Sequence, residues 1–155
     1  MGNKKILKNL YLFKDLSDNE IKIIEKATSS CSFGVGDEVF SQGDRATALY
    51  VIHKGSIKIY QKTSGGDKVE ITRIGDGSHF GEMSFLDGEA RSASAAALES
   101  TEILAIDYNK LNEIMREHQS IAVHFYKQFS IFLCGRLRVT TQDLSFSRSK
   151  ILSHF

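Results

Sequence analysis

The most constraining feature of this chain is a run of short β-rich segments, from Cys31 to Asp107, separated by glycine-containing turns. The segments are rich in β-branched and aromatic residues, and the turns recur at intervals of about ten residues. The clearest turn is the sequence TSGGD at 63–67, where glycine supplies the positive φ angle that a tight hairpin requires. This spacing is typical of an antiparallel sandwich or barrel.

Helical patterns flank the β-rich region. Ser17 and Glu20 have the spacing of a capping box and precede an apolar run, so a short helix is expected to begin there. After Asp107 the apolar period becomes helical, first in YNKLNEIMREH and then in a longer segment from Ser120 to about Phe146. A chain of 155 residues can bury one well-formed core, so we expect a single domain.

Composition limits the classes of partner. Lysine and arginine number 20 against 19 aspartates and glutamates, so no field of one sign favours nucleic acid or an anionic membrane, and any anion site must be local. Cys31 and Cys134 form no C-x-x-C motif and are expected to be reduced thiols. No apolar run reaches the roughly 18 residues of a membrane span, and no signal-peptide pattern opens the sequence. We therefore expect a cytoplasmic location and no membrane partner.

The sequence HFGEMSFLDGEARSASA, at residues 79–95, contains the strongest candidate for a ligand site. Gly81 allows the backbone to approach a ligand, and the helical turn expected next would direct its free N–H groups toward an anion. Arg91 follows a turn and can return paired N–H donors to the same anion. Glu82 would repel an anion, so we expect its carboxylate to accept hydrogen bonds from hydroxyls such as those of a ribose. One site would then hold a phosphate and a sugar.

This segment resembles the phosphate-binding cassette of cyclic nucleotide-binding domains, whose approximate pattern is F-G-E-hydrophobic-small, six variable residues, then R-[A/S/T]-A. The match runs from Phe80 to Ala93 without a gap. Upstream, the sequences GDEVF, SQGD, LYVI and KGS match, in order, the glycines and strands that such domains place at the corners of their β-roll. The resemblance covers most of the chain.

The resemblance implies a mainly β fold, an antiparallel β-roll of the jelly-roll type (a double-stranded β-helix), with N-terminal helices and a C-terminal helical lid. The single domain, 1–155, would comprise N-terminal helices in 1–30, the β-roll in 31–107, the cassette in 80–93 and C-terminal helices in 108–146.

The resemblance also implies a role for individual residues. Glu82 would bind the ribose 2′-hydroxyl, and Arg91 would bind the cyclic phosphate. The rest of the cassette would line the phosphate: Gly81, Met83, Ser84, Ser92 and Ala93. The alternative is that Glu82 and Arg91 form an ion pair between two turns, which at a surface contributes only about 0–1 kcal/mol.

Within this family the chain is most similar to the sensor domain of bacterial catabolite-activator proteins. The cassette continues R-S-A, and the long helix carries RLRVTT at 136–141. In those activators a similar segment turns two adjacent hydroxyls, one from each subunit of a dimer, toward the adenine of cAMP. Thr140 and Thr141 stand on those positions after Arg136, and Thr72 matches a strand hydroxyl near the base. The alternative for the two helical threonines is hydrogen bonding to a carbonyl one turn earlier.

These matches favour cAMP as the ligand, with cGMP second, because the Ser92 hydroxyl can also serve the guanine amino group. Ala90 replaces the proline of many eukaryotic-type cassettes, which is expected to leave that turn less preorganised. Only nine residues follow Phe146, too few for a helix-turn-helix. We therefore expect no DNA-binding module in this chain, which would be a free-standing sensor or part of a longer regulator.

The long helix repeats an apolar residue every seven positions, at Phe125, Phe132, Val139 and Phe146. Such a seam indicates either packing on the parent domain or a helix pair in a homodimer. The expected partners are thus a cyclic nucleotide and either a second copy of the chain or an unidentified effector protein.

Catalytic chemistry is not indicated by the remaining residues. The five histidines are scattered without an H-x-H or H-E-x-x-H motif, which argues against a cupin-type metal enzyme. No Ser-His-Asp or Cys-His arrangement is suggested. We expect a binding domain that is not an enzyme and needs no cofactor or metal. Besides the cyclic nucleotide-binding domain and the metal enzyme, a third class is a dimerisation module whose pocket has lost its ligand.

Overall fold

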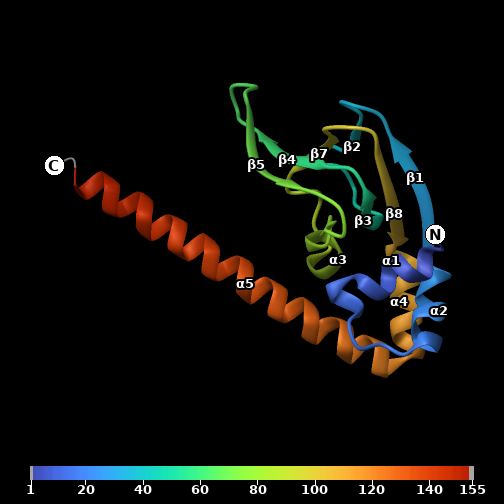
Figure 1. Cartoon of the computed structure of the whole chain (residues 1–155). Helices are drawn as coiled ribbons and strands as arrows, with labels where there is room; N and C mark the ends of the chain where they lie inside the picture. Colours follow the sequence, from blue (N-terminus) through green and yellow to red (C-terminus); the bar gives the residue numbers. More distant parts are fainter. Residues whose placement is uncertain (1, 154–155) are drawn as a thin grey trace.

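The computed structural model describes residues 2–153 and contains two antiparallel four-stranded sheets that face each other as a β-roll (Figure 1). The sheets have the strand orders β1-β8-β3-β6 and β2-β7-β4-β5. The strands are β1 Thr28–Phe33, β2 Glu38–Phe40, β3 Ala48–Lys54, β4 Ile57–Lys62, β5 Lys68–Ile74, β6 His79–Phe80, β7 Ser94–Ala97 and β8 Thr101–Asp107. The mainly β fold with flanking helices is confirmed.

Five α-helices and a 3₁₀ turn flank the strands in the described part of the chain. They are α1 Asn3–Asn9, the 3₁₀ turn Tyr11–Phe13, α2 Asp18–Glu25, α3 Met83–Asp87, α4 Tyr108–Glu117 and α5 Gln119–Leu152. The N-terminal helices lie near α4 and the start of α5, whereas α3 lies beside the roll (Figure 1). The roll begins at Thr28 and not at Cys31, because Thr28 pairs with Ile106 at the edge of the first sheet.

Local sequence signals account for several of these elements. The Ser17 side chain accepts a hydrogen bond from the Glu20 N–H at 3.2 Å, and Glu20 Oε1 accepts from the Ser17 N–H at 3.0 Å, which confirms the capping box. The hydrogen bond from the Ser17 N–H also lowers the pKa of the Glu20 carboxyl. The hairpin between β4 and β5 closes through Thr63 N–H donating to the Asp67 carbonyl at 2.8 Å, with Gly66 at φ +86°.

Two apolar clusters hold the fold together. The larger one joins the helices to the first sheet, and its largest fully buried side chains include Phe13, Phe125 and Phe129. The smaller one fills the roll between the sheets and consists of Ile52, Ile57, Phe80, Ala95, Ala97 and Ile103. The small residues of β7, all buried, allow the sheets to approach closely around Phe80. Phe80 thus anchors the start of the cassette in the roll.

Helix α5 extends past the expected end at Phe146, to Leu152. Only its first part packs on the domain, and the remainder projects away from the roll (Figure 1). The predicted seam divides accordingly. Phe125 is fully buried, Phe132 is half-buried, and Val139 and Phe146 are 56% and 62% exposed. Packing on the parent domain therefore explains the first two positions of the seam and not the last two.

Candidate functional site

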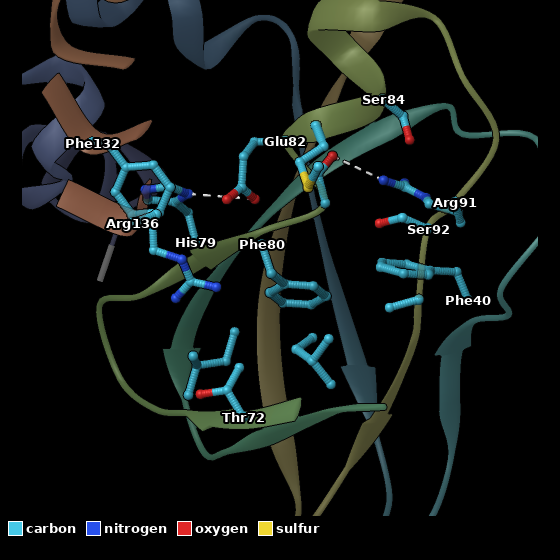
Figure 2. A pocket seen from close by; sticks show the side chains of 15 residues that line it. Phe40, Thr72, His79, Phe80, Glu82, Ser84, Arg91, Ser92, Phe132 and Arg136 are labelled. Carbon is cyan, nitrogen blue, oxygen red and sulfur yellow. Dashed lines mark hydrogen bonds and ion pairs between the residues drawn. The ribbon is translucent and has the colours of Figure 1, made fainter. Parts of the chain in front are cut away.

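A pocket of about 630 Å³, its open mouth included, lies between the roll, the cassette and α5 (Figure 2). Strands β4, β5 and β6 supply one part of the wall, α5 supplies another, and the cassette supplies most of the polar groups. The lining residues are Phe40, Ile59, Thr72, Ile74, His79, Phe80, Gly81, Glu82, Met83, Ser84, Arg91, Ser92, Ala93, Phe132 and Arg136.

The cassette backbone depends on Gly81, which has a left-handed conformation with φ +77°. A Cβ atom at this position would lie 2.7 Å from Arg91 Nη1 and 3.3 Å from Tyr50 Cδ2, so the position has no room for a side chain. Helix α3 begins two residues later. Its N-cap residue, Glu82, makes no side-chain cap, so the N–H groups of Met83 and Ser84 have no intrahelical or capping acceptor, whereas that of Phe85 donates to the Glu82 carbonyl at 3.1 Å.

Arg91 is held in a buried position by both its backbone and its side chain. Its N–H donates to the Asp44 carbonyl at 2.9 Å and its carbonyl accepts from the Gly43 N–H at 2.8 Å, which fixes it against the predicted SQGD turn. The residue is 4% exposed, and its guanidinium carbon lies 4.1 Å from the centre of the Phe40 ring. Such stacking of a cation on an aromatic face is favourable.

The guanidinium of Arg91 makes three hydrogen bonds to neutral groups. Nη1 donates to the Gly81 carbonyl at 2.8 Å and to the Tyr108 hydroxyl at 3.1 Å, and Nη2 donates to the Ala48 carbonyl at 2.6 Å. A guanidinium has five N–H donors. Paired donors aimed at a ligand are expected from the sequence, but three of the five donors contact protein, which leaves the Nε–H and one Nη2–H without an acceptor within residues 2–153.

The charge of Arg91 has no counterion in the described part of the chain. No carboxylate lies within 4.0 Å of it there, so the alternative of an ion pair with Glu82 is wrong for this structure. Burial raises the pKa of the Tyr108 phenol, and that of Tyr50 for the same reason, so neither supplies a negative charge near neutral pH. A buried cation without an anion is unfavourable, and an anion in the pocket would relieve this.

Glu82 lies at a different side of the pocket, with its side chain 14% exposed. Its Oε2 is 3.7 Å from Nδ1 of His79, and Figure 2 shows the carboxylate turned toward this ring and not toward Arg91. The pocket therefore separates a cation from a carboxylate. A ligand that carries both an anionic group and hydroxyl donors would match the two.

The apolar wall of the pocket was largely missed by the sequence analysis. Phe40, Ile59 and Ile74 come from three different strands, and the Phe40 ring packs against that of Phe80 in a tilted arrangement at a centroid distance of 5.9 Å. One signal could have located part of this wall. Ile59 pairs directly with Thr72 across the β4–β5 hairpin, whose turn is evident from the sequence. Such a wall suits a flat, weakly polar ring such as a nucleobase.

A family model for the cyclic nucleotide-binding domain matches residues 30–118, which include the roll, the cassette and α4. The chain belongs to the cyclic nucleotide-binding domain family. The match covers more than half of the 155 residues and includes both Glu82 and Arg91.

Curated relatives of this cyclic nucleotide-binding domain include a bacterial and a eukaryotic protein. The cyclic AMP receptor protein of Thermus thermophilus is 36% identical over 138 residues, which are 89% of this chain and 62% of the relative. A cAMP-dependent protein kinase regulatory subunit of Debaryomyces hansenii is 28% identical over 127 residues, 81% of this chain and 27% of the relative. The chain thus spans about 62% of the length of the bacterial relative.

Among solved structures, the catabolite activator protein of Thermus thermophilus has a TM-score of 0.76 and 30% identity, covering 88% of this chain and 62% of that chain. A cyclic nucleotide-binding domain from Methylobacillus flagellatus has a TM-score of 0.80 at 20% identity and covers 92% of this chain and 84% of that chain. The second likeness concerns the fold alone.

The structure of this cyclic nucleotide-binding domain brings most of the predicted site residues together. The predicted residues of the cassette, with Thr72 and Arg136, all line the pocket. Met83 has an exposed side chain, so its contribution would come from its backbone, whereas Ser84 is buried. Thr72 reaches the pocket from β5, and Arg136 reaches it from α5.

Thr140 and Thr141 do not line this pocket. Both are exposed on the part of α5 that projects from the domain, and their hydroxyls donate to the carbonyls of Arg136 at 3.0 Å and Leu137 at 2.8 Å. In a single chain they therefore adopt the alternative arrangement, bonding to the preceding turn. A role that depends on a second subunit stays a prediction.

Within residues 2–153, no group of three or more histidine, cysteine, aspartate or glutamate side chains is placed to hold a metal ion. Over the same residues, no helix has the length and apolar character needed to cross a membrane.

Proposed function

We propose that this domain binds a 3′,5′-cyclic nucleotide, cAMP in preference to cGMP, in the pocket between the roll and α3. The observation that carries the proposal is the state of Arg91. The residue is 4% exposed, and its guanidinium has no carboxylate partner within residues 2–153 and retains an unpartnered Nε at the pocket. The cyclic phosphate, a monoanion, would supply the missing charge and acceptors.

The other walls of the pocket fit the rest of such a ligand. The Glu82 carboxylate would accept a hydrogen bond from the ribose 2′-hydroxyl, and the cassette N–H groups, with the Ser84 and Ser92 hydroxyls, would surround the phosphate. Phe40, Ile59 and Ile74 would contact the base, with Thr72 offering a hydroxyl at its edge. The preference for cAMP follows the relatives, which include a cyclic AMP receptor protein and a cAMP-dependent kinase subunit.

The proposed role is regulatory and not enzymatic. Phe132 and Arg136 place α5 in the pocket wall, so a ligand would contact both the roll and this helix. Binding would then shift the population of α5 arrangements by as much as the ligand's affinity differs between them. The exposed apolar residues of the projecting half of α5, such as Leu137 and Phe146, would carry that change to a second copy or an effector protein.

Isothermal titration of the purified chain with cAMP, cGMP and cyclic di-AMP tests this function. The expected result is one cAMP per chain, with cGMP weaker and the larger dinucleotide weakest. Adenosine 5′-monophosphate is the matched control, because it keeps the base and sugar but opens the phosphate ring. An absence of binding for every cyclic mononucleotide, or equal binding of the open monophosphate, would refute the proposal.

The double substitution Thr140→Ala and Thr141→Ala is expected to weaken cAMP binding selectively, by about tenfold, while cGMP binding changes little. The reason is the loss of hydroxyls that a paired α5 would direct to adenine, at about 0.5–1.5 kcal/mol for each hydrogen bond. Titration with both nucleotides measures the effect. Thr140→Ser with Thr141→Ser keeps the hydroxyls and is the control. An equal loss for the two nucleotides would show that α5 does not discriminate the base.

A further inference from the structure

His79 occupies the junction between the cassette and α5. It lies on β6, and its side chain is only 6% exposed. On one side its ring contacts the Phe132 ring of α5, with a centroid distance of 4.5 Å and an interplanar angle of 57°. On the other side its Nδ1 lies 3.7 Å from Oε2 of Glu82, as the dashed line in Figure 2 shows.

The polar atoms at this junction are not satisfied. Nδ1 of His79 is buried and has no hydrogen-bond partner, and the 3.7 Å separation from Glu82 is slightly longer than a hydrogen bond. Leaving a buried polar group unpaired is unfavourable, so a small rotation of the Glu82 side chain that closes this gap would be favoured. Other charged groups here are Arg136, whose guanidinium lies 5.9 Å from the Phe132 ring, and Arg91 beyond the cassette.

Glu82 needs such a partner if it is to bind a sugar efficiently. No hydrogen bond fixes its carboxylate within residues 2–153, and an unrestrained glutamate loses rotamer freedom when it binds a ligand. A neighbouring donor that fixes the carboxylate beforehand reduces this loss and raises affinity. In the tautomer that carries its proton on Nδ1, His79 is a donor of this kind.

We propose that His79 is a positioning residue for the ligand's sugar: its Nδ1 orients the Glu82 carboxylate, while its ring, packed against Phe132, holds α5 beside the cassette. This inference rests on the proposed function. It predicts that the Nδ1 of His79 raises binding affinity only for ligands that carry a 2′-hydroxyl.

Two substitutions separate the two contacts of His79. His79→Phe keeps an aromatic ring against Phe132 and removes the ring nitrogens. His79→Asn keeps an amide donor at the position of Nδ1 and removes the ring. Each variant is titrated with cAMP and with 2′-deoxy-cAMP, and hydrogen exchange of α5 amides is followed with and without cAMP. Thermal unfolding of each variant verifies that it is folded at the temperature of the titration.

For His79→Phe we expect cAMP binding to weaken about tenfold, with little change for 2′-deoxy-cAMP and retained protection of α5 on binding. For His79→Asn we expect the preference for cAMP over the deoxy ligand to remain and the protection of α5 to fall. An unchanged affinity of His79→Phe, or an equal loss for both ligands, would overturn the inference. If His79→Phe does not fold, the His79→Asn variant tests the inference by itself. Loss of its preference for cAMP over 2′-deoxy-cAMP would then overturn the inference. Failure of the unsubstituted chain to bind cAMP would instead refute the proposed function.

Discussion

Replacing Arg91 with alanine is expected to lower the affinity for cAMP by about 2–5 kcal/mol, a loss of about 30-fold to several thousand-fold. The magnitude is that of removing one member of a buried, hydrogen-bonded charge pair, because the phosphate would lose the cation of a residue that is 4% exposed. Titration of the variant with cAMP measures the loss directly. An affinity equal to that of the unsubstituted chain would show that Arg91 does not bind the phosphate.

The effect of Arg91→Ala on the free domain has to be measured separately. The substitution removes the hydrogen bonds to the Gly81 and Ala48 carbonyls and the stacking on Phe40, but it also removes a buried charge that has no counterion in the described chain. These contributions oppose each other in the free energy of unfolding. Arg91→Lys is the matched control, because it keeps the charge and loses the planar donors. Its affinity for cAMP should lie between those of the other two proteins.

Gly81→Ala is expected to reduce both stability and cAMP affinity. Gly81 has φ +77°, and this left-handed conformation costs a non-glycine residue about 1–2 kcal/mol. In addition, the new Cβ would lie 2.7 Å from Arg91 Nη1. The guanidinium must therefore move from the place where the phosphate would bind. We expect at least a tenfold loss of cAMP affinity, measured by titration, together with a lower unfolding temperature.

Gly88→Ala separates the two causes. Gly88 ends α3 with φ +72°, and a Cβ there would meet nothing within 4 Å. This variant has a similar backbone cost without displacing Arg91, so it should lose less stability than Gly81→Ala and bind cAMP nearly as well as the unsubstituted chain. If the two variants bind cAMP equally well, the close contact between Gly81 and Arg91 does not matter for the ligand.

The state of Arg91 also explains how a chain of nearly balanced charge can recognise an anion. The formal net charge is +1, so long-range attraction contributes little. Recognition would instead come from one desolvated cation that lines the pocket and keeps a donor without an acceptor within residues 2–153. A ligand anion would complete this group's interactions in a partly dry site, where they are stronger than in water.

The sequence alone determined those features that depend on near neighbours in the chain. The capping box of α2 requires only Ser17 and Glu20, and the hairpin turn at 63–67 requires only its glycines. The cassette could be located for the same reason, because Gly81, α3 and the turn before Arg91 lie within a few residues of one another. Each of these features is set by local backbone geometry and hydrogen bonding.

Only the tertiary structure decided which distant residues complete the site. Arg91 bonds to the carbonyl of Ala48, 43 positions away, and His79 on β6 meets Phe132 on α5, contacts that depend on how strands pair and where a helix packs. The tertiary structure also showed that α5 leaves the domain before Thr140 and Thr141, because only apolar side chains near the start of this helix are buried. Such contacts follow from the packing of the whole chain, which no local pattern encodes.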